Sequence, residues 1–382
     1  MAPGLYIHIP FCIKKCVYCD FYSITDLSLR ETFCDSLKKE MDLIQAFPSP
    51  FDTVYLGGGT PSILDSHQIA GIIEATRNRF SMANASEITI EANPGTISLK
   101  KCQDYRSMGI NRLQIGIQSF QDRYLAFLGR IHSSDEAKLA IQYARKSGFS
   151  NIGLDLIYGI PGQNQTDLLS DLRQAVTFEP EHVSCYMLTC EPGTALDLAR
   201  KRGEFHLAQE DDMAVHYLTV VEFLESNGYE QYEISNFARR HHRYPGHWRS
   251  RHNQKYWQSE PYLGLGPSAH SFSPPQRSWN YRNMAAYCQA VSKGMMPLEG
   301  TETLTPDQQM MEAIYLGLRT TDGISLAEFE YRFQRSLMPV IDATLTDSLV
   351  RNLAVYDGNR FRLRRSGMLM MDSIAGFLIN HI

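Results

Sequence analysis

The sequence predicts an α/β protein: an open, partial (β/α)6 barrel over residues 1–228, a connecting region, and a small carboxyl-terminal α+β domain. Three observations support this fold class. Strand-like segments alternate six times with amphipathic helical segments in the first half of the chain. Unusual polar or glycine-rich motifs follow these strands directly. After Pro297 the pattern changes to helices followed by a short hairpin.

The six strand candidates are short and mostly β-branched or aromatic. They cover Leu5–Ile9, Thr53–Leu56, Glu87–Glu91, Arg112–Ile117, Asn151–Ile157 and His182–Leu188. Apolar spacings of three and four predict intervening helices around residues 37–44, 69–76, 139–144, 168–176 and 208–225. Six βα units are fewer than the eight that close a barrel, so we expect an open sheet with its ligand at the carboxyl ends of the strands.

The chain changes character twice after the barrel. Residues 229–297 form a connecting region that is rich in His, Arg, Tyr, Trp, Gly and Pro and has weak periodicity. In the last part, residues 298–382, we predict helices near 306–318, 325–333, 340–348 and 368–379, and strands at 353–356 and 360–363. Helices followed by a hairpin are typical of a small winged-helix module.

The composition is that of an ordinary globular protein. Hydrophobic residues make up 43% and charged residues 21%, and the net charge of −5 gives no global attraction to nucleic acid or anionic lipid. No apolar run reaches the ~20 residues that span a bilayer, and the amino terminus lacks a secretory pattern. We therefore expect a cytoplasmic protein, or an organelle protein that has already been processed, with reduced cysteines.

Three of the eight cysteines, Cys12, Cys16 and Cys19, form a Cx3Cx2C motif after the first predicted strand. Thiolates are the usual ligands of iron–sulfur clusters. Three of them can hold three irons of a [4Fe–4S] cubane and leave the fourth iron open to a small molecule. Zinc usually needs four ligands with paired spacing, and His8, the nearby candidate for a fourth, lies inside a predicted strand. The motif therefore favours a cluster.

Cx3Cx2C after a first strand resembles the signature of the radical S-adenosylmethionine (SAM) superfamily. The segment Tyr6–Cys12, read as Tyr-Ile-His-Ile-Pro-Phe-Cys, is similar to the branch of oxygen-independent coproporphyrinogen III oxidase and its relatives. The resemblance extends over nearly the whole chain. It implies a radical SAM barrel, a [4Fe–4S] cluster on the three cysteines and SAM, with Tyr6 and Tyr18 among the cofactor-contacting residues.

The resemblance also implies the residues that bind SAM, which are Gly58, Gly59, Thr60, Glu91, Gln118, Arg130 and Asp155. The glycine motif and Glu91 would serve the amino group, Gln118 and Asp155 the ribose, and Arg130 the carboxylate. From the residues alone, a tight turn explains the glycines equally well, and a surface position is the alternative interpretation of Glu91. Asp155 lies in a predicted buried strand, where a carboxylate needs a hydrogen-bond donor.

Two features separate members of this branch. Phe21 stands where the decarboxylating oxidases have a further cysteine, and only five residues precede Tyr6, where those oxidases have an extension. The HNxxYW motif of His252, Tyr256 and Trp257 is similar to that of the HemW family of heme chaperones. Histidine can ligate heme iron, and aromatic rings can pack on a porphyrin. Ordinary packing of a loop over the barrel mouth is the alternative. Other candidates for the iron ligand are His241, His242, His247 and His270.

The resemblance implies a heme chaperone that binds heme, a [4Fe–4S] cluster and SAM, and delivers heme to an acceptor such as a respiratory hemoprotein. It leaves a homodimer open, and any membrane contact would be peripheral, through the acceptor. The enzymatic alternative is oxidative decarboxylation of coproporphyrinogen III, against which Phe21 and the short amino terminus argue; no catalytic residue is assigned. DNA binding is a third option, through a basic hairpin containing Arg360, Arg362, Arg364 and Arg365. A solvated basic face is the favoured interpretation there, and we expect no nucleic-acid partner.

Overall fold

A computed structural model of the protein describes residues 2–44, 49–346 and 352–382. The first half of the chain contains six parallel strands in sequence order, as predicted. They are β1 (Gly4–Ile9), β2 (Phe51–Gly58), β3 (Met82–Ala92), β4 (Arg112–Gln118), β5 (Ile152–Tyr158) and β6 (His182–Met187). Each predicted strand core lies within the observed strand or overlaps it, because the β-branched and aromatic runs that predicted them are also buried.

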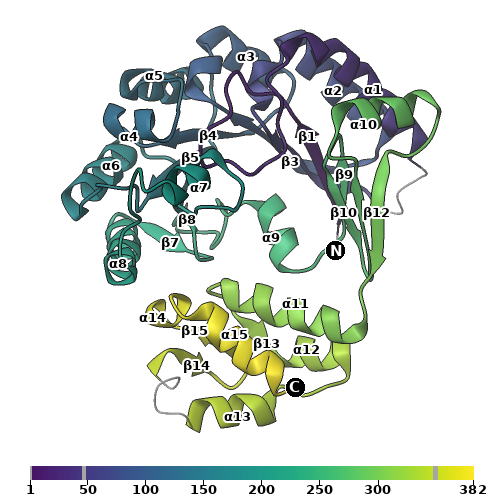
Figure 1. Ribbon diagram of the computed structural model, residues 1–382. Coiled ribbons are helices and arrows are strands. Elements are labelled where there is room, and N and C mark those ends of the chain that lie inside the picture. Colours follow the sequence, from purple (N-terminus) through teal and green to yellow (C-terminus); the bar gives the residue numbers. More distant parts are fainter. Residues whose placement is uncertain (1, 45–48, 347–351) are drawn as a thin grey trace.

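Among the described residues, six helices connect these strands, mostly on the outside of the curved sheet, and two more follow β6 (Figure 1). They are α1 (Arg30–Leu43), α2 (Ser66–Arg79), α3 (Leu99–Ser107), α4 (Asp122–Phe127), α5 (Ser134–Lys146), α6 (Gln165–Thr177), α7 (Ala195–Lys201) and α8 (Glu210–Ser226). Three short 3-10 helices, η1 (Leu27–Leu29), η2 (Pro61–Ile63) and η3 (Pro94–Thr96), follow β1, β2 and β3. The sequence did not predict α3, α4 and α7. Each of them buries only two residues, too few to form an apolar stripe.

The connecting region extends the sheet at both edges. On one side β8 (Asn236–Arg239) pairs antiparallel with β6, and β7 (Tyr229–Gln231) pairs with β8. On the other side β9 (Tyr262–Leu265) pairs parallel with β1. It is followed by the antiparallel strands β10 (His270–Ser273), β11 (Gln276–Asn280) and β12 (Leu298–Thr303). Strands β1 to β12 thus form one open sheet with β12 and β7 at its edges, which confirms the predicted fold class.

The two faces of the parallel strands differ in polarity. In β3, Ile88 and Ile90 are buried in the apolar core, and Glu91 alternates with them. Successive side chains of a strand point to opposite faces of the sheet, so Glu91 lies on the other face. Polar residues of neighbouring strands meet there; for example, Gln114 of β4 donates a hydrogen bond of 2.6 Å to Asp155 of β5. The inner face of the sheet is therefore polar, and the outer face is covered by helices.

Glu40 of α1 ties the β9–β11 edge of the sheet to the barrel. This fully buried carboxylate accepts hydrogen bonds from the backbone N–H of Gly266 (2.8 Å), the Asn280 amide (2.6 Å) and the Tyr287 hydroxyl (2.6 Å). Tyr287 belongs to α10 (Met284–Ser292). Burial raises the pKa of Glu40 to about 7, although the three donors act to lower it. The folded protein consequently holds a proton on Glu40 at pH values where the unfolded chain has released it.

A raised carboxyl pKa stabilises the fold at low pH and loses that contribution as the pH rises through the folded-state pKa. We therefore expect the stability advantage of the wild type over Glu40→Gln to shrink by about 3 kcal/mol between pH 5 and pH 8. Urea unfolding at several pH values measures this difference. Glu74→Gln, an exposed change on α2, is the matched control and is expected to be independent of pH. Parallel curves for wild type and Glu40→Gln would contradict the assignment.

The carboxyl-terminal part forms a separate small unit of helices and a three-stranded sheet below the barrel in Figure 1. Its elements are α11 (Pro306–Arg319), β13 (Ile324–Ser325), α12 (Leu326–Phe333), α13 (Met338–Thr346), β14 (Ala354–Tyr356), β15 (Arg360–Leu363), α14 (Arg365–Met368) and α15 (Met371–Asn380). The predicted helices and hairpin are confirmed; residues 347 and 348 of the third predicted helix lie outside the described residues. Strand β15 lies between β13 and β14.

The arginines of this hairpin are engaged with the protein itself. Arg360 donates to the backbone carbonyls of Asp322 (2.7 Å) and Gly323 (3.1 Å). Arg362 forms an ion pair with Asp357 of the same hairpin. Arg365, the first residue of α14, pairs with Glu225 of α8. Three of the four arginines that suggested a DNA-binding wing therefore have protein partners, and the hairpin does not present a continuous basic face. In the described parts of the chain, no helix combines the length and apolar character that crossing a membrane requires.

Candidate cofactor site

The three clustered cysteines lie on a loop that follows β1. The loop is closed at its base because the backbone N–H of Cys12 donates to Ile24 O (3.0 Å) and the N–H of Ile24 donates to Pro10 O (2.7 Å). A turn brings the N–H of Cys19 to the carbonyl of Cys16 (3.2 Å). All three thiols are free. Backbone hydrogen bonds thus fix the loop at the carboxyl end of the first strand without any disulfide.

Polar side chains from the loops after β2 and α4, and from the cysteine loop itself, contact these thiols. The Thr60 hydroxyl, just after β2, lies 3.6 Å from Cys12 Sγ. Arg130, in the loop after α4, donates from Nη1 to Cys16 Sγ (3.4 Å). Tyr18 forms a hydrogen bond with Cys16 as well, and burial raises the pKa of its hydroxyl. Hydrogen bonds to the sulfurs of an iron–sulfur cluster help to set its reduction potential. Thr60, Arg130 and Tyr18 lie close enough to the cysteine sulfurs to have this effect on a bound cluster.

The donor set does not suit a single zinc ion. Four zinc ligands must converge on one point, and the described residues contain no group of three or more His, Cys, Asp or Glu arranged in that way. His8 is not free to act as a fourth ligand: its Nε2 contacts Tyr22 O (2.9 Å) and its Nδ1 contacts the Tyr6 hydroxyl (3.2 Å). Burial lowers the pKa of His8 to about 4, so its ring is neutral at pH 7. In a cubane each cysteine binds a different iron, so the three thiolates need not converge on one metal ion.

The glycine motif at the end of β2 lets this strand lie directly against the cysteine loop. Gly58 has a φ of +108°, and a Cβ at this position would lie 2.7 Å from the His8 ring. A Cβ on Gly59 would lie 2.7 Å from the backbone oxygen of Phe11. The N–H groups of Gly59 and Thr60 donate to Ile9 O (2.8 Å) and Phe11 O (2.7 Å). Close approach to the cysteine loop, rather than a tight turn alone, therefore requires these glycines.

Glu91, at the end of β3, is a partly buried carboxylate with no ion pair to any described cation. It accepts hydrogen bonds from the Tyr55 hydroxyl (2.8 Å) and from the backbone N–H of Gly58 (3.2 Å). Burial raises its pKa to about 7, and Asp155 acts in the same direction, whereas the two donors lower the pKa. A cationic ligand group beside Glu91 would satisfy this carboxylate. The interpretation of Glu91 as a surface residue is therefore wrong.

Gln118 and Arg130 lie side by side and keep unsatisfied polar atoms. Gln118 ends β4 with a φ of +68°, in the left-handed region that non-glycine residues rarely adopt. Arg130 Nη2 donates to Gly116 O (2.8 Å). Gln118 Oε1 and Arg130 Nε are both buried and have no hydrogen-bond partner among the described residues. Buried polar atoms are rarely left unpaired, which indicates that a polar ligand belongs here.

Asp155 has the donors that the sequence argument required. It accepts from Gln114 Nε2 (2.6 Å) and from Ser184. Burial raises its pKa to about 6, against the effect of these donors and of Arg130. The carboxyl ends of β1 to β5 thus bring together the cysteine loop, the glycine motif, Glu91, Gln118 with Arg130, and Asp155.

Sequence analysis missed Tyr55, which links Glu91 to residues deeper in the barrel. Tyr55 packs against Tyr6 (ring centroids 6.2 Å apart) and stacks on His252 (5.1 Å, interplanar angle 26°). A signal was present in the sequence, because Thr53, Tyr55 and Gly57 alternate along one predicted strand and share a face. Nothing in the local sequence, however, indicates that Glu91 would be its partner.

The HNxxYW motif lies at the opposite end of the barrel from the cysteines. It forms α9 (Arg251–Trp257), and the next strand, β9, runs parallel to β1. The segment that precedes β9 must therefore lie at the amino ends of the strands. The N–H of His252 donates to Glu87 (3.2 Å), and its Nδ1 contacts the Thr53 hydroxyl (2.8 Å). The motif therefore does not form a loop over the barrel mouth, and that interpretation is wrong. It lies in a helix at the amino ends of the strands.

His252 of the motif is enclosed by the barrel, whereas Tyr256 and Trp257 are half-buried. His252 is 1% exposed, and its Nε2 contacts the Tyr256 hydroxyl (2.9 Å). Trp257 packs against Tyr232, with ring centroids 5.8 Å apart. Burial lowers the pKa of His252 to about 3. Both ring nitrogens of His252 are engaged, so iron ligation by this residue would require one of these two contacts to break.

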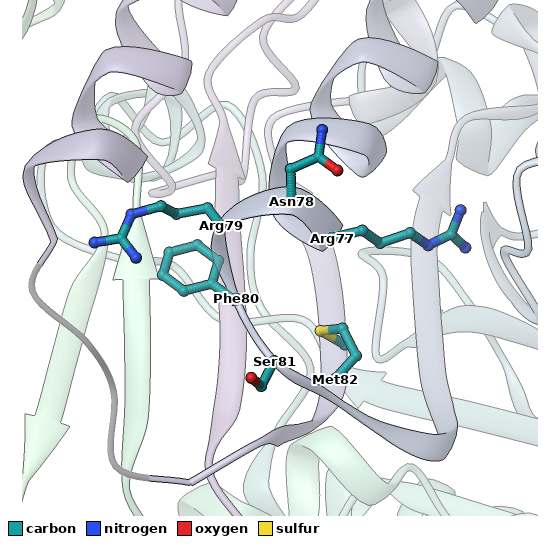
Figure 2. Close-up of a pocket in the computed structure, with 6 residues that line it drawn as sticks. All are labelled: Arg77, Asn78, Arg79, Phe80, Ser81 and Met82. Carbon is teal, nitrogen blue, oxygen red and sulfur yellow. The ribbon is translucent and has the colours of Figure 1, made fainter.

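A surface hollow lies away from the cysteine loop and the residues around it. Figure 2 shows that it is lined by the end of α2 and the start of β3, with the Arg77 and Arg79 side chains on its rim. Phe80 beneath it packs on Phe51 (5.5 Å). The hollow is therefore at the amino ends of the strands, away from the cysteine loop, and none of the predicted site residues lines it.

Comparisons with known proteins identify the family. The radical SAM superfamily pattern matches residues 6–175, and the HemN C-terminal domain pattern matches residues 304–370. The heme chaperone HemW of Bacillus subtilis strain 168 is 32% identical over 99% of each chain. The heme chaperone HemW of Mycobacterium tuberculosis strain H37Rv is 35% identical over 98% of this chain and 94% of that one. The solved structure of coproporphyrinogen III oxidase from Escherichia coli superimposes with a TM-score of 0.83 at 22% identity, over 100% of this chain and 91% of that chain.

The parallel barrel, the cysteine loop and the superfamily match define a radical SAM protein, and this class implies a [4Fe–4S] cluster and SAM. Within the class, the chain belongs to the HemW family. The resemblance seen in the sequence is thereby confirmed. The likeness to coproporphyrinogen III oxidase concerns the fold alone.

The glycine motif provides a direct test of the loop geometry. In Gly59→Ala the new methyl group meets backbone atoms of Phe11, which cannot rotate away. We expect a loss of about 1–3 kcal/mol in the free energy of unfolding, together with a lower iron content after reconstitution. Gly71→Ala on α2 is the control, because its Cβ would meet only the flexible end of Lys38, at 3.5 Å. Equal stability and iron content in the two variants would contradict this role of Gly59.

Proposed function

We propose that this protein is a heme chaperone that holds a [4Fe–4S] cluster on Cys12, Cys16 and Cys19, binds SAM beside it, and carries heme to an acceptor hemoprotein such as a respiratory enzyme. The observation that carries the proposal is the 32–35% sequence identity, over nearly the whole chain, with proteins named as heme chaperones, combined with a cysteine loop and polar side chains on one rim. Heme and its acceptor are the partners; the acceptor provides any contact with a membrane.

The residues around the cysteine loop fit the chemical groups of SAM. We assign the ammonium group to Glu91 and the glycine motif, since this carboxylate is partly buried and has no cation of its own among the described residues. We assign the ribose hydroxyls to Gln118 and Asp155, and the carboxylate to Arg130, whose Nε is unpaired in the described structure. Tyr18, Tyr6 and Thr60 complete the surroundings of the two cofactors.

The cluster supplies one-electron chemistry at an open iron when it is bound. The residues of the chain bind and orient what surrounds it. Arg130 contacts Cys16 Sγ with one nitrogen and Gly116 O with another, so it connects the cysteine loop to the end of β4. Tyr55 holds Glu91 in one position through a 2.8 Å hydrogen bond. These contacts orient the site before a ligand enters, which lowers the entropic cost of binding.

The oxidase alternative has less support. Phe21, which replaces the further cysteine of the oxidases, is 69% exposed beside the cysteine loop and offers no proton donor or acceptor. The structural likeness to the Escherichia coli oxidase is a likeness of fold. Nothing in the described chain supplies a functional substitute for that cysteine at the same place.

The deciding experiment uses anaerobically reconstituted protein. One portion receives SAM, dithionite and coproporphyrinogen III, and another is titrated with heme under the same reducing conditions. We expect heme uptake, seen by absorption spectroscopy, and no protoporphyrinogen by product analysis. Formation of protoporphyrinogen would replace the proposal with the oxidase, and failure to take up heme with an intact cluster would overturn it.

A further inference from the structure

The segment between β8 and α9 is an ordered, cationic and aromatic loop on the surface. Its sequence from residue 239 to residue 249 is RRHHRYPGHWR. Backbone hydrogen bonds stabilise it: the N–H groups of Arg243 and Tyr244 donate to His241 Nδ1 (3.3 and 3.2 Å), and the N–H of His247 donates to Tyr244 O (3.2 Å). The loop therefore has a defined shape, although most of its side chains face solvent.

Histidine and aromatic rings gather at this loop. His241 stacks on Tyr244 (ring centroids 5.3 Å apart, interplanar angle 28°) and lies 4.9 Å from His247. His247 in turn lies 4.4 Å from Trp248. His242 and His247 are exposed, and their ring nitrogens form no hydrogen bond with any described residue. These two imidazoles are therefore available as metal ligands, in contrast to the enclosed His252.

Positive charge surrounds the same rings. Arg239 and Arg249 are neutralised by Glu181 and by Glu230 with Asp322. Arg240 and Arg243, in contrast, form no ion pair with a described carboxylate. Together with residues 239, 241, 242, 244 and 248 they line a hollow of about 720 Å³, within the usual range for a small-molecule site. Two unpaired guanidinium groups at an aromatic hollow favour a planar ligand that carries two anionic groups.

We propose that this hollow is the docking site for heme: the imidazole of His242 on its lining, or that of His247 next to the lining residue His241, ligates the iron, Arg240 and Arg243 pair with the two propionates, and Tyr244 and Trp248 contact the porphyrin. The assignment rests on the proposed function, because it locates the cargo of a heme chaperone. Aromatic and arginine side chains also suit single-stranded nucleic acid. We favour heme because exposed imidazoles can ligate its iron. Binding of nucleic acid would not require a group of exposed imidazoles.

The position of the hollow separates the cargo from the cofactors. The carbonyl of Trp248 accepts a hydrogen bond from Arg112 (3.2 Å), the first residue of β4, so the loop lies at the amino ends of the strands. The cysteine loop lies at the carboxyl ends. Helix α9 directly follows this loop and closes the barrel floor with His252, which stacks on Tyr55, the donor to Glu91. Contacts along the barrel interior thus run from the hollow to the SAM site.

Heme titration of the full-length, anaerobically reconstituted protein tests the proposal. The variants are the pair His242→Ala with His247→Ala, the pair Arg240→Ala with Arg243→Ala, and the single change His252→Ala. The control pair, His67→Ala with His206→Ala, removes two exposed histidines elsewhere. We expect the first pair to weaken heme binding at least about tenfold and to abolish the absorption and EPR signature of imidazole-ligated heme. We expect the arginine pair to weaken binding while keeping that signature, and cluster content to stay unchanged in both.

Wild-type affinity and an unchanged heme spectrum in the His242/His247 pair would overturn the docking site and leave the proposed function standing. Loss of heme binding in His252→Ala alone, with cluster and fold intact, would also overturn it in favour of α9. Absence of heme uptake by the wild type would overturn both proposals. Salt-sensitive retention of single-stranded DNA by a wild type that does not bind heme would identify the hollow as a nucleic-acid site instead.

Discussion

Replacing Cys16 by serine is expected to abolish assembly of the [4Fe–4S] cluster while the protein remains folded. Serine keeps the size of the side chain but lacks the thiolate that binds iron. The loop itself is held by backbone hydrogen bonds of Cys12 and Ile24, which the substitution does not touch. Iron and sulfide contents after anaerobic reconstitution, together with the visible absorption of the cluster, measure the effect. Circular dichroism checks the fold.

Cys288→Ser is the matched control for this experiment. Cys288 belongs to α10, is a free and partly buried thiol, and lies outside the cysteine loop. We expect it to retain the iron content of the wild type. Wild-type iron content in Cys16→Ser would refute the assignment of the loop, and loss of iron in Cys288→Ser alone would move the cluster to a different set of cysteines.

Glu91→Gln is expected to weaken SAM binding about a hundredfold, which corresponds to about 3 kcal/mol. The amide keeps the shape of the side chain but removes the negative charge that we assign to the SAM ammonium. Tyr55→Phe is the graded comparison, because it removes only the 2.8 Å hydrogen bond to this carboxylate. We expect Tyr55→Phe to cost about tenfold. SAM titration of the reconstituted protein, followed by the EPR signal of the reduced cluster, gives both affinities.

The pH dependence of SAM binding separates a charge effect from a loss of shape. Only the ionised form of Glu91 attracts an ammonium group, and burial raises its pKa to about 7 in the free protein. The affinity of the wild type should therefore fall as the pH drops from 8 to 6, with binding coupled to the release of a proton. The SAM affinity of Glu91→Gln should not show this fall between pH 8 and pH 6. Equal affinities and equal pH profiles for the two proteins would exclude Glu91 as the ammonium partner.

The sequence by itself determined the elements whose chemistry is local. The Cx3Cx2C spacing, the glycine motif and the six short apolar strands each depend on neighbouring residues, and each is found at the predicted place. The rule that ligands lie at the carboxyl ends of parallel strands then placed the cysteine loop, Glu91 and Asp155 on one rim without any knowledge of their contacts.

Only the tertiary structure decided the positions of groups that depend on long-range pairing. Strand β9 pairs with β1 from a point in the chain more than 250 residues away, and this pairing, which no local pattern encodes, puts α9 at the floor of the barrel. His252 thus became an enclosed contact of Tyr55, whereas His242 and His247 stayed in solvent on the preceding loop. A sequence motif fixes which groups are present. Whether a ring nitrogen is free or already hydrogen-bonded depends on what the rest of the chain packs against it.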